Sequence, residues 1–432
     1  MNSSRNYHRL LAGQFLGAFG DNFVLAAALG PLTFSLATGA ITEREVNAQN
    51  ALFSAVFFVP FIVLAPLAGW LNDRMPKTAW LLGGNAIKLA GAALGLVGVW
   101  LHAGDFHASR LWQVAGYAII GLGACVYSPA KYGILPEILP AERLVKANGM
   151  VEMLTLVAIV GGLGGGAALY DATRSLPACY LASAALYLAA LVCNSRMTLT
   201  PHNAAASLRR SVGEFAGNLR RLLTHARLGR VLLGCALFWF AGATLRSNLQ
   251  GWGLQVFHEA GVHDVTNTKL ALLKLGLVLG IVAGSVLAGR LHRVGDLSWS
   301  RRYGLLMAAA VVALGLLGGH AGLAVVIVAL VAAGVFAGLL IVPLNAALQH
   351  ESDPRALGKT IAIQNFTDYL AMLIGAGFLA ALTAAGLTPT QIFVALPVAL
   401  AVASVALRMR SASEPTESSE VGAVVPAATS AK

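Results

Sequence analysis

Charge is scarce in this sequence, and so are cysteines. Only 11% of its 432 residues are charged, whereas a soluble domain carries about a quarter. The four cysteines are dispersed and form no CxxC pair, which argues against a disulfide framework or a metal site. We interpret them as small hydrophobic side chains. The low charge excludes an ordinary water-soluble domain.

The short motifs of common enzymes are also missing. No Ser-His-Asp, HExxH or Walker sequence is present, so we expect no catalytic residues and no cofactor. One stretch, GGLGGGAALYD at residues 161–171, looks like a dinucleotide-binding loop. It lacks the GxGxxG spacing, because Ala167 occupies the third position. Its small residues instead indicate a helix that approaches a neighbouring helix closely.

What the chain has in abundance is apolar runs of 18 or more residues. Each is long enough to cross a bilayer core of roughly 30 Å as a helix. The short alternating segments of a membrane β-barrel do not fit these runs. The sequence therefore predicts an all-α polytopic membrane protein with twelve transmembrane helices. The predicted spans are 10–37, 47–72, 78–101, 112–136, 144–170, 176–196, 229–257, 269–291, 302–320, 322–348, 357–385 and 389–408.

Basic residues are distributed unevenly between the loops. The net charge of +11 would by itself suggest a nucleic-acid partner. However, about 21 Lys and Arg lie at the termini or in loops after even-numbered spans, against about four in the other loops. This asymmetry follows the positive-inside rule. We therefore expect no nucleic-acid binding, and we expect both termini to be cytoplasmic.

A basic, polar stretch divides six predicted spans from six. We predict an N-terminal six-helix bundle at residues 1–196 and a C-terminal six-helix bundle at residues 229–409. Most of the stretch SLRRSVGEFAGNLRRLLTHARLGR falls in the linker 197–228. The stretch is amphipathic in places, and we expect the linker to form helices on the anionic inner leaflet. Residues 410–432 are rich in Ser, Ala, Glu and Pro, and we expect a disordered tail.

The two predicted bundles share sequence patterns. GAFGDN in the first span aligns with GATLRSN in the seventh, which places Asp21 opposite Arg246. A longer segment, SPAKYGILPEILPAERLVKANGMVEML, parallels VPLNAALQHESDPRALGKTIAIQNFTDYLAML in the tenth and eleventh spans. The positions paired there are Lys131 with Asn345, Asn148 with Asn365, and Glu152 with Asp368. Transporters use two such pseudo-symmetric halves to build a site at the bilayer midplane.

Seven ionisable residues fall within predicted spans, where a buried charge is costly and marks a candidate site. They are Asp21, Lys88, Lys131, Glu152, Arg246, Lys274 and Asp368. With four bases and three acids the set sums to +1, which suits an anionic or zwitterionic ligand better than a cation. We interpret Lys88 and Lys274 as residues that snorkel or pair locally.

Arg246 is the strongest candidate for binding an anion, because its planar guanidinium fits phosphate or carboxylate. Lys131 offers a point charge for the same anion. Asp21 either takes an ammonium group or pairs with Arg246 when the site is empty. The competing interpretation is that these three residues form a buried network that locks the halves together. Asn22, next to Asp21, belongs to the predicted substrate site.

Glu152 and Asp368 leave more alternatives open. Each follows an asparagine, Asn148 or Asn365, by one helical turn, so each acid shares a face with its asparagine. Three roles are open for the two acids: to bind substrate, to carry a proton, or to form a salt bridge between the halves. Asn345 and Asn365 complete the predicted substrate site.

The stretch GWLNDRMPK joins the second and third predicted spans. It is similar to the cytoplasmic signature of the major facilitator superfamily, a charge and helix-end network that holds the cytoplasmic side shut in one state. The predicted gating residues are Gly69, Asp73, Arg74 and Lys77. In the corresponding stretch of the second half, GRLHRVGDLSWSRR, the only acid is Asp296 and it lies farther along. We therefore expect a weaker second gate.

Several motifs together resemble the bacterial lysophospholipid transporters of the major facilitator superfamily. They are QFLGAFGDN, SPAKYGILPEI, LVKANGMVE, FWFAGATLR, VPLNAALQ and AIQNF. The similarity covers nearly the whole chain and implies the major facilitator fold. It implies uptake of lysophospholipids, chiefly 2-acyl-glycerophosphoethanolamine, across a bacterial inner membrane by facilitated diffusion. The headgroup-binding charges of that family match Asp21, Lys131 and Arg246 by motif.

The resemblance also implies partners. A cytoplasmic acyltransferase and acyl carrier protein synthetase would restore the diacyl lipid. No HxxxxD acyltransferase signature is present, so we expect the acyltransferase to be a separate protein. We expect the transporter to be a monomer. We also expect the Gly- and Ala-rich C-terminal half to shelter the acyl chain. The alternative is a major facilitator carrier of another amphiphile or drug, coupled to protons through Asp21 or Glu152. A lipid enzyme and a non-transporting scaffold are disfavoured.

Overall fold

The computed structural model describes residues 2–37, 43–103, 105–200, 207–261, 267–318 and 322–409. Within these ranges the chain is built from helices and short connections, without a strand. Eleven of the helices are long and apolar enough to cross a membrane, and a bent pair makes a twelfth when it is counted as one span. The prediction of an all-α polytopic membrane protein is confirmed. The predicted tail, 410–432, lies outside the described residues.

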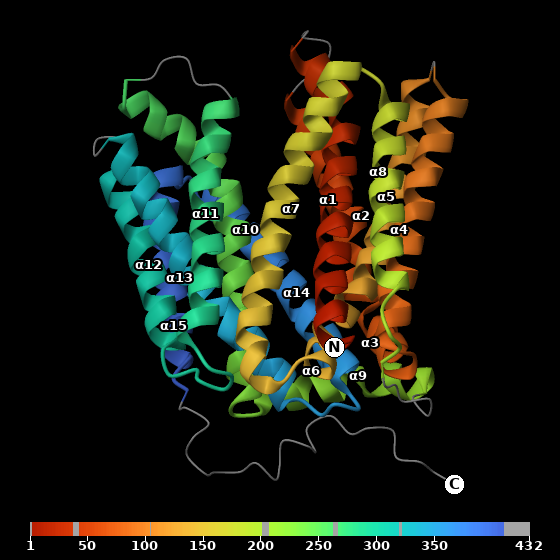
Figure 1. Ribbon diagram of the computed structural model, residues 1–432. Helices are drawn as coiled ribbons and strands as arrows, with labels where there is room; N and C mark the ends of the chain where they lie inside the picture. The colour runs from red at the N-terminus through yellow and green to blue at the C-terminus, as the bar shows by residue number, and fades with distance from the viewer. Residues whose placement is uncertain are drawn as a thin grey trace.

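The helices of the first half pack around α1, which contacts α7 and α8, and around the pair α4 and α5. Figure 1 shows them standing side by side, nearly parallel to one another. Their bounds are α1 Asn2–Ala37, α2 Glu43–Val63, α3 Ala65–Arg74, α4 Lys77–Leu101, α5 Phe106–Gly133, α6 Leu135–Ile138, a 3-10 turn at Ala141–Arg143, α7 Leu144–Thr173 and α8 Leu176–Ser195.

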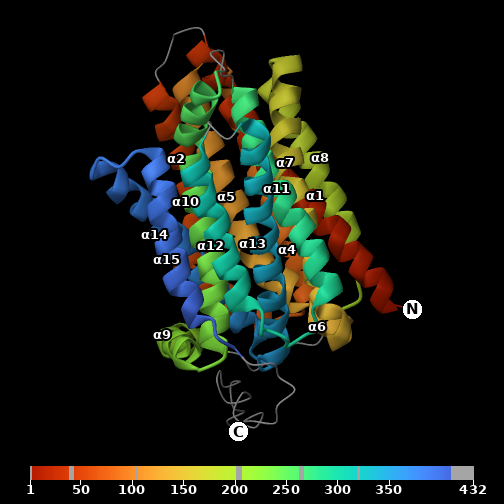
Figure 2. The same ribbon diagram turned by 90° about the vertical axis from the view of Figure 1, so that its left-hand side faces the viewer.

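The second half packs α11 against α13, α10 against α14 and α12 against α15. Figures 1 and 2 show this group beside the first half, with α7 and α11 adjacent where the two groups meet. Its bounds are α10 Leu228–Glu259, α11 Asn267–Leu291, α12 Ser300–Leu317, α13 Leu323–Glu351, α14 Leu357–Ala384 and α15 Pro389–Ala406. The exact boundaries predicted for the two bundles stay a prediction.

The start of α1, the end of α15 and the short helices α3, α6 and α9 lie at one face of the molecule, the lower one in Figure 1. We call it the terminal face. The predicted loops after even-numbered spans lie at this face, as the charge asymmetry requires. That it faces the cytoplasm stays a prediction.

A sharp bend divides the second span into α2 and α3. The two helices meet at Leu64 at an angle of 60°. Pro66, in the first turn of α3, has no N–H to donate, and its ring clashes with the carbonyl four residues earlier, so α2 cannot continue through it. The bend directs α3 toward α14 in the second half, which it contacts. This local proline chemistry therefore positions the junction between the halves.

Glycines allow close approach of helices in the first half. A Cβ on Gly91 of α4 would lie 2.5 Å from the carbonyl oxygen of Gly116 in α5. In the glycine-rich stretch of α7, a Cβ on Gly162 would overlap the carbonyl oxygen of Phe19 in α1. Only glycine tolerates these contacts, so the interpretation of that stretch as a helix-packing surface agrees with the structure.

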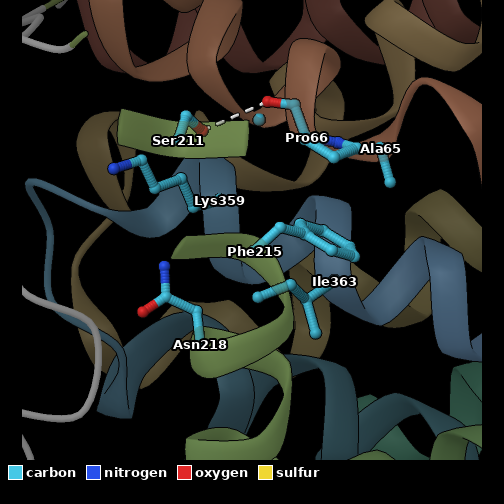
Figure 3. A pocket seen from close by; sticks show the side chains of 8 residues that line it. Ala65, Pro66, Ser211, Phe215, Asn218, Lys359 and Ile363 are labelled. Atoms are coloured by element: carbon cyan, nitrogen blue, oxygen red, sulfur yellow. Dashed lines mark hydrogen bonds between the residues drawn. The ribbon is translucent and has the colours of Figure 1, made fainter. Parts of the chain in front are cut away.

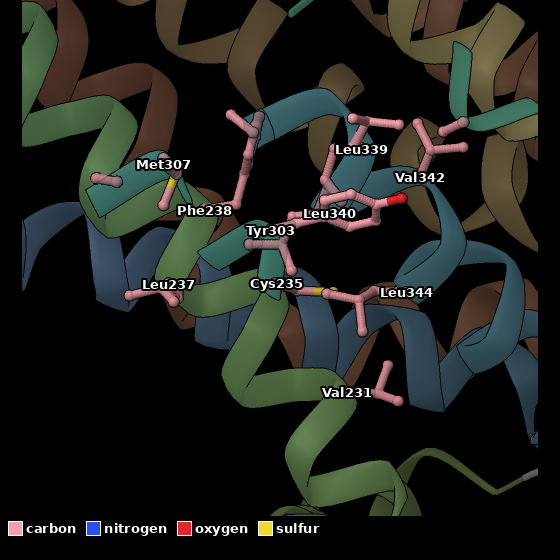
Figure 4. Close-up of a cluster of buried hydrophobic side chains, with 14 of the residues drawn as sticks. Val231, Cys235, Leu237, Phe238, Tyr303, Met307, Leu339, Leu340, Val342 and Leu344 are labelled. Carbon is pink, nitrogen blue, oxygen red and sulfur yellow. The ribbon is translucent and has the colours of Figure 1, made fainter. Parts of the chain in front are cut away.

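The predicted amphipathic linker contains α9, Leu208–Thr224. It lies across the terminal face, where the Ser211 hydroxyl donates to the carbonyl of Pro66 at 3.2 Å (Figure 3). Residues 201–206 of the linker lie outside the described residues. The chain then enters the second half, whose apolar core is formed by α10, α12 and α13. Figure 4 shows Cys235, Met307 and Leu340 from these three helices in that core.

Candidate substrate cavity

A cavity of about 270 Å³ lies between the two halves. Its walls come from α1, α2, α4, α5 and α7 of the first half and from α10, α13 and α14 of the second. All eight predicted binding residues line it: Asp21, Asn22, Lys131, Glu152, Arg246, Asn345, Asn365 and Asp368. Lys88 lines it too. The fold therefore brings the two aligned sequence patterns to opposite walls of one cavity.

Asp21 is buried and is held by neighbours from its own half. The Lys88 ammonium on α4 lies 2.6 Å from Oδ2, and the Tyr187 hydroxyl on α8 donates to Oδ1 at 2.9 Å. Gly20 makes room for this contact, since a Cβ there would lie 2.8 Å from the Tyr187 ring. Asp21 therefore pairs with Lys88 and not with Arg246, the partner expected for Asp21 when the site is empty. A buried lysine needs a counter-charge, and Asp21 supplies it.

Arg246 is the exposed charge of the cavity. Among the described residues, no hydrogen bond or ion pair engages its guanidinium. One turn earlier on α10, a Cβ on Gly242 would meet open space, so little encloses this part of the helix. Lys131 on α5 is half-buried, and its ammonium lies 4.3 Å from the centroid of the neighbouring Tyr132 ring. Both cations therefore remain available to an anionic group.

Glu152 connects the halves through hydrogen bonds. Its Oε1 accepts from the Tyr132 hydroxyl at 2.6 Å and from Asn345 Nδ2, across the interface, at 3.2 Å. Asn345 Oδ1 in turn accepts from Gln364 Nε2 at 2.7 Å. Glu152 on α7 thus reaches α13 through an amide rather than through a salt bridge.

The two asparagines that the repeat aligns both reach into the opposite half. Asn148 on α7 exchanges hydrogen bonds of 2.8 and 2.9 Å with Gln349 on α13. Asn365 on α14 bonds Ser128 on α5, with Nδ2 donating at 3.0 Å. No pattern in the sequence points to Gln349 or Ser128, because an uncharged polar side chain near a helix end carries no distinctive signal.

Asp368 is a buried carboxylate without a cation. Its side chain is 6% exposed, and its Oδ1 has no hydrogen-bond partner among the described residues. Trp239 lines the same cavity. No ion pair neutralises Asp368 within the part of the chain that the structure describes. Since an unpaired buried charge is costly, this carboxylate is suited to an incoming cation or to a proton.

Aromatic side chains from α2 and α14 form one wall of the cavity. Tyr369 stacks against Phe61 and Phe58, with ring centroids 4.1 and 5.2 Å apart, and Phe57 and Met372 extend this wall. Apolar surface of the cavity thus comes from both halves, and shelter of an acyl chain by the C-terminal half stays a prediction. Phenylalanines spaced by three and four residues in α2 indicate an aromatic helix face. In a membrane helix, however, such a face can contact lipid as well as line a cavity.

The cavity is closed toward the terminal face by the predicted gating residues Gly69 and Asp73. Asp73 accepts from the backbone N–H groups of Gly358 and Lys359 at 2.8 and 3.3 Å. These groups begin α14, whose N-terminus favours a negative charge. A Cβ on Gly69 would lie 3.0 Å from the Lys359 Cα, so the backbones touch. We call these four residues the terminal gate.

The other two predicted gating residues contact side chains of the first half. Lys77 forms an ion pair with Glu137 of α6. Arg74 is exposed, with its guanidinium 5.7 Å from the centroid of the Trp70 ring on its own helix. In the second half, Asp296 lies 3.6 Å from His292 in its own loop and bonds Ser298. This acid thus contacts its own loop, and the weaker second gate stays a prediction.

The hydrogen bonds described between the halves join residues that line the cavity, such as Asn365 and Ser128, or residues on its terminal-face side, such as Asp73 and Gly358. Figure 1 shows α7 and α11 converging toward that face and separating toward the other. At the converging end, a Cβ on Gly149 would overlap the carbonyl oxygen of Ser285, and Gly289 packs on the backbone of Lys146. The structure is therefore in a state closed at the terminal face.

Comparison with known proteins agrees with this architecture. The profile of the Major Facilitator Superfamily matches residues 10–375. Similar solved structures include the human organic anion transporter MFSD10, with a TM-score of 0.76 and 16% identity over 94% of this chain and 100% of that one. Another is the E. coli Fucose:proton symporter FucP, with a TM-score of 0.69 and 15% identity over 94% and 99%. At these identities the likeness shows the fold.

Curated relatives are more similar in sequence. The Lysophospholipid transporter LplT of Photorhabdus laumondii is 33% identical over 379 residues, which cover 87% of each chain. The protein of the same name from Yersinia pestis is 32% identical over 380 residues, 87% of this chain and 86% of the relative. Because the profile and these relatives both extend over most of its length, the chain belongs to the Major Facilitator Superfamily and, within it, to the family of the lysophospholipid transporters LplT.

Proposed function

We propose that this protein transports lysophospholipids across the membrane by rocking its two halves about the central cavity. The observation that carries the proposal is the pairing of two available cations, Arg246 and Lys131, with an aromatic wall in one cavity between the halves. A lysophospholipid has the matching parts, a phosphate and a single acyl chain. The relatives named as lysophospholipid transporters support this substrate class. The proposed activity is transport rather than catalysis.

The phosphate binds Arg246 and Lys131 in this proposal. The Arg246 guanidinium is exposed in the cavity, and its planar donors fit two phosphate oxygens at once. Lys131 faces the same cavity from α5 of the opposite half. An anion held by both would neutralise a cation of each half. Binding would then favour conformations that bring these two walls together.

The ammonium of an ethanolamine headgroup has two candidate partners. Asp21 is bonded by Lys88 and Tyr187, so an ammonium would have to displace Lys88. Asp368 has an oxygen without a partner among the described residues. We therefore assign the ammonium to Asp368, with Glu152 adding negative potential nearby, and assign Asp21 to holding Lys88.

The acyl chain lies against the aromatic wall of Phe57, Phe58, Phe61, Tyr369 and Met372. A cavity of about 270 Å³ is slightly smaller than the roughly 300–1,000 Å³ typical for small-molecule sites. It therefore suits a headgroup and the beginning of the chain. The rest of the chain stays in lipid during transport, where its transfer costs little because tails and bilayer are equally apolar.

The setting of this transport is also proposed. We place the protein in a bacterial inner membrane with the terminal face in the cytoplasm, because the basic residues of the loops gather at that face. Lysophospholipid delivered to the cytoplasmic leaflet would be reacylated by a separate acyltransferase and acyl carrier protein synthetase. A monomer suffices, since one chain contributes both walls of the cavity.

Leaflet-resolved uptake into proteoliposomes tests the proposal. Labelled lysophosphatidylethanolamine is added to the outside, and its arrival in the inner leaflet is followed with and without a proton gradient. Wild-type protein should transport it in both conditions, whereas Arg246→Ala and Lys131→Ala should be strongly impaired. The matched control is Arg302→Ala, which removes an exposed arginine of α12 outside the cavity.

Two results would contradict the proposal. Transport by Arg246→Ala and Lys131→Ala at the wild-type rate, with both proteins folded and inserted, would overturn the phosphate assignment. Transport that stops when the proton gradient is collapsed would instead favour a proton-coupled carrier.

A further inference from the structure

The linker helix α9 covers the place where the two halves meet at the terminal face. Its Ser211 hydroxyl donates to the Pro66 carbonyl of α3 at 3.2 Å. Its Phe215 ring meets Phe366 of α14 edge-on, with centroids 5.5 Å apart. The helix thus binds one element of each half. Figure 3 shows Ser211 and Phe215, together with Pro66 of α3 and Ile363 of α14, around a small cavity between the three helices.

That small cavity borders the terminal gate. Gly69 and Lys359, whose backbones touch in the gate, line it together with Ser211, Phe215 and Asn218 of α9. If the terminal face opens, α3 must separate from α14, because Asp73 bonds the first N–H groups of α14. α9 would then lose its contacts with at least one of the two helices. Its packing therefore stabilises the closed gate.

The buried face of α9 follows the helical period. Ser211, Asn218 and Leu222 are buried and Phe215 is half-buried, which fits the spacing i, i+4, i+7, i+11 of one helix face. This face uses the small and apolar side chains of the segment. The exposed side chains of α9 lie outside this face.

The exposed surface of α9 has an apolar flank and a basic flank. Leu208, Val212 and Leu223 lie on one side and are 38, 55 and 49% exposed. Arg209 and Arg220 are exposed and come next around the helix, opposite the buried face. Arg221 is exposed farther round. Figure 2 shows α9 at the level of the terminal helix ends, beside α14 and α15. This is the level of the lipid headgroups for a chain that spans a membrane.

We propose that α9 is a strap docked on anionic phospholipid headgroups of the leaflet at the terminal face, and that this docking keeps the terminal gate closed. Charge complementarity identifies the partner, because α9 carries four arginines and one glutamate. Anionic lipid attracts this basic flank. The apolar flank inserts beside it, as in interfacial amphipathic helices. Docking uses the exposed surface, so it reinforces the contacts with α3 and α14 and does not compete with them.

The test compares vesicles of phosphatidylcholine alone with vesicles that contain about one third phosphatidylglycerol, using the full chain without added lysophospholipid. Spin labels at Met75→Cys and Arg355→Cys, in a background without the four native cysteines, report the distance across the terminal gate. We expect the ratio of closed to open protein to rise about fivefold in the anionic vesicles, which corresponds to a modest shift in the equilibrium.

Two variants separate α9 from general surface charge. Arg209→Gln, Arg220→Gln and Arg221→Gln together should abolish the response to phosphatidylglycerol. The matched control, Arg290→Gln, Arg293→Gln and Arg302→Gln, removes three exposed arginines near the α11–α12 connection and should keep the response. A fluorophore at Val212→Cys should report an apolar environment in the anionic vesicles only. Phe215→Ala, which weakens the buried face, should lower the closed fraction in both kinds of vesicle.

An unchanged gate distance in the two kinds of vesicle would overturn the proposal. So would a control variant that loses the response as fully as the α9 variant, or a Val212 label that stays in water. Since no substrate is present, these outcomes are independent of whether the protein transports lysophospholipids.

Discussion

The two halves have opposite charges at the same position of the repeat, and these charges differ in burial and pairing. In the first half, Asp21 is buried and held by Lys88 and Tyr187. In the second half, Arg246 is exposed in the cavity. The first half has neutralised its charge internally, whereas the second half keeps its charge available for a ligand. Equal positions in a repeat therefore do not imply equal roles.

The largest effect is expected from breaking the internal pair of the first half. Asp21→Asn leaves the Lys88 ammonium buried without a counter-charge, and such a break costs about 3–5 kcal/mol of stability. Adding Lys88→Met removes the stranded charge and should recover most of that loss. Thermal unfolding of the purified protein measures both. Equal stability of wild type and Asp21→Asn would show that the pair has no structural role.

Arg246→Ala should show the reverse pattern, a large loss of transport with little change in stability. The exposed guanidinium has no partner to lose among the described residues, whereas a charge-assisted contact with phosphate contributes about 1.5–3 kcal/mol. Transport should fall about 10- to 100-fold by the usual conversion. Arg246→Lys should restore part of it. Uptake assays combined with thermal unfolding distinguish this result from misfolding, and a strongly destabilised Arg246→Ala would contradict the comparison.

Transport of lysophospholipids with different headgroups tests which acid, Asp368 or Asp21, binds the ammonium. Asp368→Asn should lower transport of lysophosphatidylethanolamine about tenfold, the effect of losing one charge-assisted hydrogen bond. Transport of lysophosphatidylglycerol, which has no ammonium, should stay near the wild-type rate. Asp21→Asn with Lys88→Met should affect the two lipids alike. If the double variant alone discriminates between the lipids, the ammonium belongs at Asp21.

The smallest effect concerns the gates of the two halves. Asp73→Asn weakens the contacts with Gly358 and Lys359 and should shift the equilibrium toward the open terminal face by about 1 kcal/mol. Asp296→Asn should change it by less than about 0.5 kcal/mol, as for a typical surface substitution. The measurement is the labelling rate of Ser128→Cys from the terminal face. Equal effects of the two substitutions would contradict the expected asymmetry.

Much of the cavity was predictable, because an ionisable residue inside an apolar run is expensive and therefore rarely without function. All eight predicted binding residues line it. The aromatic wall was not predictable, since Phe57 or Phe61 could equally have faced lipid. Nor was the Asn148–Gln349 contact, because it depends on which face of α7 meets α13. The contacts of Arg74 with Trp70 and of Lys77 with Glu137 also depend on packing, and their part in the gate stays a prediction.

The sequence by itself determined the membrane-spanning helices, their number, the two-half plan and the family, because each depends on local length, hydropathy and motif. Only the tertiary structure decided which charges are paired. Lys88 reaches Asp21 because glycines bring α1 close to its neighbours, and Arg246 stays exposed because little packs against α10 beside it. Ion pairs form over distances of a few ångströms. Such distances follow from the rotation and approach of whole helices, which no local pattern specifies.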